Sequence, residues 1–162
     1  VWDLHEGPPH SVTPDLPISA VEHDTPRIPQ GALVVPGTYT VTLQADGISQ
    51  TRPLKVALDP RITMSAQALA QQYAMAHDVA TLLDTTFSDM LRAKQQNNMK
   101  TVANLGRLNA ELSALIDLID GVDGPVTQGT RQGYCEVTSE TRRALGEHLM
   151  ANACGKEGRT SP

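Results

Sequence analysis

Apolar and polar residues alternate strictly along residues 38–45. This period of two residues predicts a β-strand with one buried and one exposed face. Asp46-Gly47 follows directly, and this dipeptide favours the two-residue type I′ turn, whose central positions both need positive φ. A return strand is expected over residues 48–58, so the pattern predicts an antiparallel β-hairpin. Pro53 has no backbone N–H to donate, and it should therefore occupy a strand edge or a bulge.

The apolar side chains of this hairpin are expected to be buried, each large one stabilising the fold by about 1.5–3 kcal/mol. They are Tyr39, Val41, Leu43, Leu54, Val56 and Leu58. A short apolar run, Val1–Leu4, predicts one further, N-terminal strand. An isolated hairpin is marginal in water, and an immunoglobulin-like sandwich needs about seven strands. Either the helices cover this small sheet, or strands that precede Val1 are missing; we favour the second, a chain that is a fragment.

Beyond residue 62 the pattern changes to helical spacing. Apolar residues recur three and four positions apart along residues 69–90 and again along residues 102–119, with a polar break between them at Gln95–Asn98. Ser65 is a candidate N-cap for the first helix. Thr127 or Thr138 could cap a third helix, whose apolar positions continue to Leu149. Short connections favour antiparallel neighbours, so three antiparallel helices are expected.

The fold class predicted from these elements is α+β, a partial immunoglobulin-like antiparallel sheet followed by an antiparallel three-helix segment. Nine of the eleven prolines lie at or before Pro60, which separates two regions of different backbone chemistry. We assign residues 1–61 to the end of a truncated sandwich, 62–153 to a helical bundle and 154–162 to a disordered tail. Residues 5–36, rich in proline, histidine and acids, should form a long ordered loop or covering arm.

Composition narrows the function classes. The 162 residues carry 13 Lys and Arg against 18 Asp and Glu, a net charge of −5, which argues against a nucleic-acid partner. Aromatic residues make up 3% of the chain, too few for an aromatic strip that stacks on bases or sugars. No apolar run approaches the roughly 20 residues that span a bilayer, so no membrane span is expected.

The two cysteines, Cys135 and Cys154, are 19 residues apart. On one helix they would lie about 28 Å apart, whereas a disulfide needs Cα atoms within about 7 Å. We therefore expect no internal disulfide unless that helix breaks. Cys135 also lacks an identifiable histidine partner for nucleophilic chemistry.

One group of residues in the arm resembles metal ligands, but it lacks a standard ligand spacing, and solvated loop residues are the preferred interpretation. These residues are His5, Glu6, His10, His23 and Asp24. Several further positions have ordinary structural explanations. His77-Asp78, Asp84 and Asp89 are expected on the solvated face of a helix. Asp117, Asp120 and Asp123 lie at a helix end, where capping and solubility explain them without catalysis, and His148 lies near a helix C-terminus, where the helix dipole favours it. Gly129 and Gly133 lack the lysine of a phosphate loop, and Trp2 is expected in the core rather than on a sugar. We assign no catalytic, metal-binding or cofactor-binding residue and no cofactor.

Four segments form a recognisable succession: Val1-Trp2-Asp3-Leu4, Asp24-Thr25-Pro26-Arg27, residues 35–43 (VPGTYTVTL) and residues 54–61 (LKVALDPR). This succession resembles the C-terminal region of large bacterial BNR-repeat, sortilin-like β-propeller proteins, often labelled glycosyl hydrolases. The W-D…P-G-T-Y-T-V portion is also similar to the immunoglobulin-like domain of flagellar hook-capping proteins. In the propeller family a helical segment follows Asp-Pro-Arg, as residues 65–152 would here.

The resemblance implies a non-catalytic accessory structural or interaction module at the C-terminus of a larger propeller protein, docked to an upstream domain of the same protein. It also implies an extracytoplasmic location, in the periplasm or outside the cell. No catalytic residue of the family falls within these segments. Two alternatives remain: a ligand- or carbohydrate-binding module that uses the arm 5–36, with a protein or a carbohydrate as the ligand, and a hydrolase fragment with a site formed by His5, His10 or His23 and nearby acids.

Overall fold

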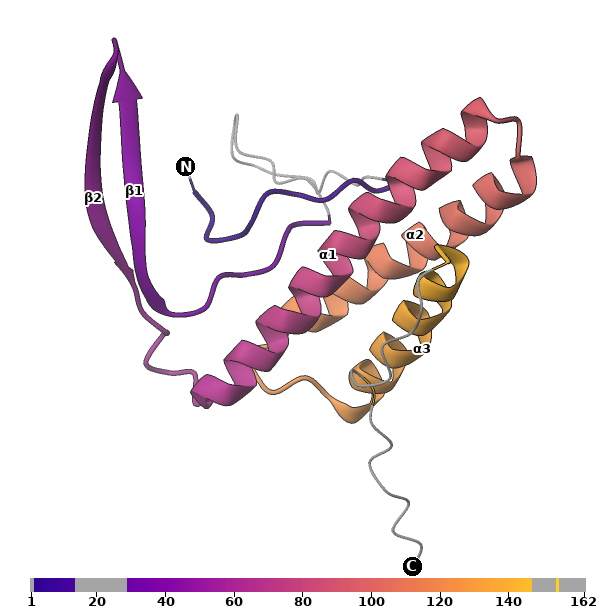
Figure 1. The fold of residues 1–162 in the computed structure, drawn as a ribbon. Coiled ribbons are helices and arrows are strands. Elements are labelled where there is room, and N and C mark those ends of the chain that lie inside the picture. Colours follow the sequence, from indigo (N-terminus) through magenta and orange to yellow (C-terminus); the bar gives the residue numbers. More distant parts are fainter. Residues whose placement is uncertain (1, 14–28, 147–153, 155–162) are drawn as a thin grey trace, which may run out of the picture.

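The computed structural model describes residues 2–13, 29–146 and 154 (Figure 1). A two-stranded antiparallel sheet is followed by three helices, which confirms the α+β class. The elements are β1 (Gly37–Ala45), β2 (Ile48–Val56), α1 (Ala66–Gln95), α2 (Met99–Asp120) and α3 (Gln128–Ala144). The hairpin stands apart from the helices, which lie side by side (Figure 1).

The hairpin forms at the predicted turn. Asp46 and Gly47 both have positive φ, 49° and 78°, as a type I′ turn requires. Pairing runs without interruption from Gly37↔Val56 to Ala45↔Ile48, so Pro53 sits in a regular strand at the edge of the sheet and not in a bulge. The second strand ends at Val56, two residues before the predicted end.

Local capping chemistry fixes the helix boundaries. The Ser65 hydroxyl accepts from the Ala68 N–H at 3.1 Å and caps α1, as predicted. The polar break is confirmed as well, because Asn98 caps α2 after Asn97 adopts a φ of 56°. Of the two candidate caps for α3, Thr127 is the one used.

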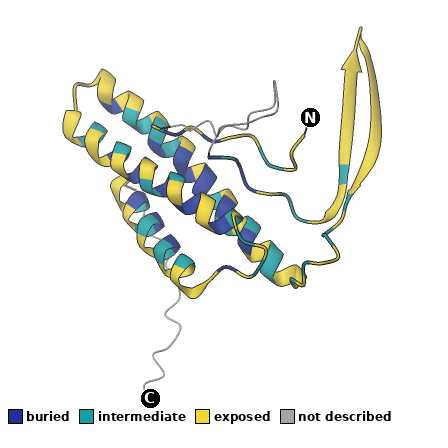
Figure 2. Ribbon diagram, turned by 180° about the vertical axis from the view of Figure 1, so that it is seen from behind, coloured by how far each residue is buried: buried dark blue, intermediate teal, exposed yellow. Residues whose placement is uncertain are grey.

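The core lies where α1, α2 and α3 meet, and its buried residues form an almost continuous stripe on α1 and α2 (Figure 2). Helical spacing predicted most of this stripe on α2. The largest fully buried apolar side chains of the two long helices are Val79 and Leu83 on α1 and Leu108, Leu112, Ile116 and Ile119 on α2.

Where the arm is described, it covers the helices, as predicted. Residues 14–28 of the arm lie outside the described residues. Two arm segments run antiparallel to each other, with the Glu6 N–H donating to the Ala32 carbonyl at 3.0 Å and the Val34 N–H to the Leu4 carbonyl at 2.9 Å. Gly31 permits this close approach, since a Cβ there would lie 2.6 Å from the carbonyl oxygens of Glu6 and Gly7.

The expected N-terminal strand is wrong for the residues described. Only an isolated bridge, His5↔Leu33, forms next to that run. Leu4 has a φ of 68°, a left-handed conformation that interrupts an extended strand.

The disulfide was excluded only for cysteines on one unbroken helix, and here that condition does not hold. Cys135 and Cys154 are bonded, with Cα atoms 5.7 Å apart. The helix that carries Cys135 ends at Ala144, and Gly146 then turns the chain with a φ of 76°. The proviso of a helix break is therefore met. The expected tail falls on residues outside the described ones, apart from Cys154.

Burial of the hairpin side chains, expected from their alternation, is at most partial within the described residues. Tyr39, Val56 and Leu58 are half-buried, whereas Val41, Leu43 and Leu54 are exposed. Leu43 is 69% exposed and Ile48 is 66% exposed, and the whole hairpin is almost uniformly exposed (Figure 2). Among the described elements, the strands contact each other but no helix. The described helices therefore do not cover the sheet, one of the two possibilities that the strand count left open.

Candidate functional site

The hairpin has two chemically different faces. Because side chains alternate across a strand, residues paired in the register share a face. One, the apolar face, carries Tyr39, Val41, Leu43, Ala45, Ile48, Leu54 and Val56, with Gln50 and Arg52 among them. The other, the threonine face, carries Thr38, Thr40, Thr42, Gln44, Ser49, Thr51, Pro53 and Lys55.

The apolar face gathers four of the exposed large hydrophobic side chains of the described residues, which are Val41 and Leu43 of β1 and Ile48 and Leu54 of β2. Leu43 and Ile48 flank the turn end, and Val41, 48% exposed, continues the row toward the base. Large exposed apolar patches on folded proteins mark interaction sites. The amphipathic pattern is that of a sheet with one packed face, yet among the described residues the four large apolar side chains Val41, Leu43, Ile48 and Leu54 of this face are exposed.

Aromatic contacts fix the base of the hairpin to the arm. The rings of Trp2 and Tyr39 meet edge to face with centroids 5.8 Å apart, while the Tyr39 hydroxyl donates to the Val35 carbonyl at 2.5 Å. The Trp2 indole N–H donates to the His5 carbonyl at 2.8 Å. Trp2 is 43% exposed, so the expectation that it lies in the core is wrong.

The suggested metal ligands in the arm face different partners. Glu6 accepts from the Tyr73 hydroxyl at 2.7 Å and lies 2.8 Å from Nδ1 of His77. His10 lies 2.7 Å from Asp84 and stacks on Phe87. Within residues 2–13, 29–146 and 154, no group of three or more His, Cys, Asp or Glu residues could hold a metal ion. The other two suggested ligands, His23 and Asp24, lie outside the described residues.

These contacts give Glu6 the electrostatics of a structural carboxylate. Burial alone would raise the pKa of Glu6, but the hydrogen bonds from His77 and Tyr73 outweigh it and lower that pKa below its ordinary value. The Tyr73 pKa is raised, chiefly by its hydrogen bond to Glu6. Glu6 thus remains ionised and holds the arm on α1, which accounts for it without catalysis.

Asn109 of α2 joins the arm to both long helices. It is fully buried; its Oδ1 accepts from the Val12 N–H at 2.8 Å, and its amide nitrogen donates to the Leu83 carbonyl at 2.9 Å, the Thr86 hydroxyl at 2.9 Å and the His10 carbonyl at 3.2 Å. Sequence reasoning did not single out Asn109, although a polar residue beside the apolar stripe of α2 was the available signal.

Asp120, expected at a solvated helix end, is instead covered by the arm. It accepts from the Leu33 N–H at 3.4 Å, and burial raises its pKa to about 6. Asp117, one turn earlier on α2, lines the same shallow cavity of about 190 Å³, whereas Asp123 is exposed. A glycosidase needs two carboxyl groups on opposite sides of the scissile bond. Asp117 and Asp120 lie one turn apart on the same helix, α2, so they do not form such a pair.

Asp78 and His77, neighbours in sequence, serve different contacts. The solvated-face interpretation is wrong for Asp78, which accepts from the Tyr134 hydroxyl at 2.7 Å and pairs with Arg142. Burial, followed by the hydrogen bond to Asp78, raises the pKa of Tyr134 to about 12. Asp89 pairs with Arg92 at 2.8 Å.

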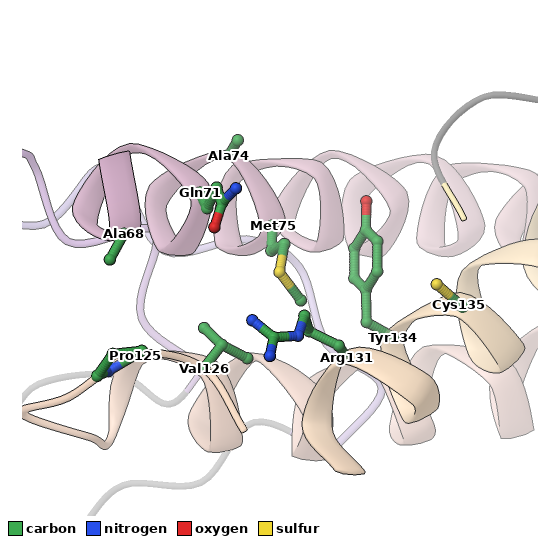
Figure 3. A pocket seen from close by; sticks show the side chains of 9 residues that line it. All are labelled: Ala68, Gln71, Ala74, Met75, Pro125, Val126, Arg131, Tyr134 and Cys135. Carbon is green, nitrogen blue, oxygen red and sulfur yellow. The ribbon is translucent and has the colours of Figure 1, made fainter. Parts of the chain in front are cut away.

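Tyr134 also lines a groove of about 420 Å³ between α1 and α3 (Figure 3). Its lining is mostly small and apolar, and Arg131 extends into it from α3 (Figure 3). Cys135 borders the groove but is held in the disulfide, so it carries no free thiol. Gly129 and Gly133 lie within α3 and form no phosphate loop. His148 lies outside the described residues.

None of the described helices carries a stretch long and apolar enough to cross a bilayer. No family model, curated protein or solved structure matches the chain.

Proposed function

We propose that this chain is a non-catalytic accessory module that docks its hairpin onto a β-rich body of a larger protein, with a helical body carried alongside. The observation that carries the proposal is the apolar face, an amphipathic sheet surface that no described helix covers and on which Val41, Leu43, Ile48 and Leu54 are exposed. The resemblance to the C-terminal region of β-propeller proteins supports a partner within the same polypeptide.

The energetics favour docking over an exposed hairpin. Two isolated strands are marginal in water, because they bury too little apolar surface. Burying Leu43 and Ile48, both about two-thirds exposed, would contribute about two-thirds of the value for full burial, or about 1–2 kcal/mol for each side chain. A partner layer therefore stabilises the hairpin as well as fixing its position.

The remaining ionisable groups support a structural role for the helical body. Glu6, Asp78, Asp84 and Asp120 each hold an arm or helix contact. The Cys135–Cys154 disulfide favours an oxidising compartment, in keeping with the extracytoplasmic location that the resemblance implies.

Thiol labelling tests the proposal, since both native cysteines are bonded and do not react. Leu43→Cys reports on the apolar face, and Thr42→Cys, its neighbour on the threonine face, is the matched control. We compare labelling rates in the 162-residue chain and in the full-length product of its gene. In the full-length protein, Leu43→Cys should react at least 100-fold more slowly, whereas Thr42→Cys should change far less. Equal rates for Leu43→Cys in the two proteins would reject docking.

A further inference from the structure

We infer that the partner adds a β-strand to the outer edge of β1, so that the hairpin extends a sheet of the β-rich body with β2 as the terminal strand. This inference rests on the proposed function and specifies its geometry. It follows from the register of the hairpin and from the position of one proline.

The turn determines which backbone groups face outward. In a two-residue hairpin the residues that flank the turn, here Ala45 and Ile48, form a hydrogen-bonded pair. Hydrogen-bonded and non-hydrogen-bonded pairs alternate from there along an antiparallel ladder. Thr42↔Thr51 and Thr40↔Pro53 are therefore non-hydrogen-bonded pairs, and their backbone N–H and C=O groups point away from the partner strand.

Pro53 makes the two edges unequal. Its nitrogen carries no hydrogen, so the outer edge of β2 lacks a donor in the middle of its row. The outward positions of β1 all carry an N–H; they are Thr38, Thr40, Thr42 and Gln44. An incoming strand can thus form an unbroken ladder on β1, whereas on β2 it would leave one of its carbonyls without a donor.

The edge of β1 is free in the described structure. The sheet formed by the described residues contains two strands, and β1 pairs with β2 alone. Exposed edges of this kind accept an added strand through main-chain hydrogen bonds. The β2 edge is the protected one, because a proline on an edge strand discourages pairing.

A β-rich body suits this edge better than a second copy of the chain. Two copies paired antiparallel through β1 would place both apolar faces on the same side of a four-stranded sheet, where Leu43 and Ile48 would remain exposed. A body that offers a free strand and an apolar layer behind it satisfies the edge and the face together.

Amide hydrogen exchange tests the assignment in the full-length product of the gene, with the 162-residue chain as the reference. The outward amides of Thr40 and Thr42 should exchange at least tenfold more slowly in the full-length protein. The outward amides of Ser49 and Thr51 should change less than threefold. Greater protection at Ser49 and Thr51 would overturn the inference.

A matched pair of proline variants gives a second test. Thr42 and Thr51 face each other across the ladder, both are exposed, and their hydroxyls contact each other at 3.4 Å, so each substitution removes the same side-chain contact. In the full-length protein, Thr42→Pro should restore fast labelling at Leu43→Cys by tenfold or more, and Thr51→Pro should leave it slow. The 162-residue chain with either proline serves as the folding control, measured by circular dichroism.

The outcomes separate the two claims. If Leu43→Cys is protected in the full-length protein while both proline variants leave it protected, the apolar face docks without strand addition, and the edge inference fails alone. If Leu43→Cys is never protected, the proposed function fails. Concentration-dependent dimers of the 162-residue chain with slowed β1 amides would assign the edge to a second copy and overturn the inference.

Discussion

Replacing Asn109 by alanine tests whether the arm is an integral part of the helical body. The substitution removes an acceptor from the Val12 N–H and a donor shared by the Leu83 carbonyl, the Thr86 hydroxyl and the His10 carbonyl. Thr86 retains its hydrogen bond to the Leu82 carbonyl, so the substitution mainly removes the hydrogen-bond partner of the Val12 N–H and of the His10 carbonyl. A buried polar group left without a partner costs about 1–3 kcal/mol.

Adding the small cavity left by a fully buried side chain, we expect a loss of about 2–4 kcal/mol in the free energy of unfolding. For a chain of this size that corresponds to a fall in Tm of roughly 5–15 °C. Asn104→Ala is the matched control, because Asn104 lies on the same helix but is exposed. Thermal and urea unfolding measure the difference, and amide exchange at Val12 measures release of the arm. Equal stability of the two variants, within 0.5 kcal/mol by the usual scatter of surface substitutions, would refute the reasoning.

Two further predictions concern charge and covalent linkage. The pKa of Asp120 is about 6 in the folded protein against an ordinary value of 3.8, so its contribution to stability is complete below pH 4 and is lost as the pH rises through 6. Asp120→Asn should therefore raise the Tm at pH 7 relative to the unsubstituted chain and flatten the decline between pH 4 and 6. Asp123→Asn, which removes the same charge at an exposed position, should not, and an unchanged pH profile for Asp120→Asn would contradict the assignment. Cys135→Ser should lower the free energy of unfolding by about 3 kcal/mol in urea titrations, because it reopens a loop with a sequence separation of 19. Dithiothreitol should destabilise the unsubstituted chain by the same amount and leave the variant unaffected. If dithiothreitol leaves the stability of the unsubstituted chain unchanged, the prediction is contradicted.

Sequence predicted the features that short-range chemistry determines. Asp46-Gly47 specifies its turn through the φ values of two adjacent residues, and Ser65 and Thr127 cap their helices through N–H groups three residues away. The spacing along α2 likewise identified its buried stripe without knowledge of what packs on it.

Contacts across long sequence distances were not predicted. Asp120 accepts from the Leu33 N–H, and Glu6 accepts from the Tyr73 hydroxyl. In both pairs one residue lies on the irregular arm, whose path no periodicity specifies. The disulfide was missed for a related reason. Its geometry depends on where α3 ends, and the apolar positions that continue to Leu149 gave no sign of a stop at Ala144.

Both strands of the hairpin connect to the rest of the chain at the same end of the ladder, the pair Gly37↔Val56 opposite the turn. Residues 34–36 enter β1 from the arm, and residues 57–65 lead from β2 into α1, while the Trp2 ring contacts Tyr39 beside the entry point. Two connections restrict rotation of the helices relative to the hairpin more than a single linker would. If the hairpin is docked on the β-rich body, the three helices can adopt only a restricted range of orientations relative to that body. A movement of the sheet to which the hairpin is added would then move the helices as well.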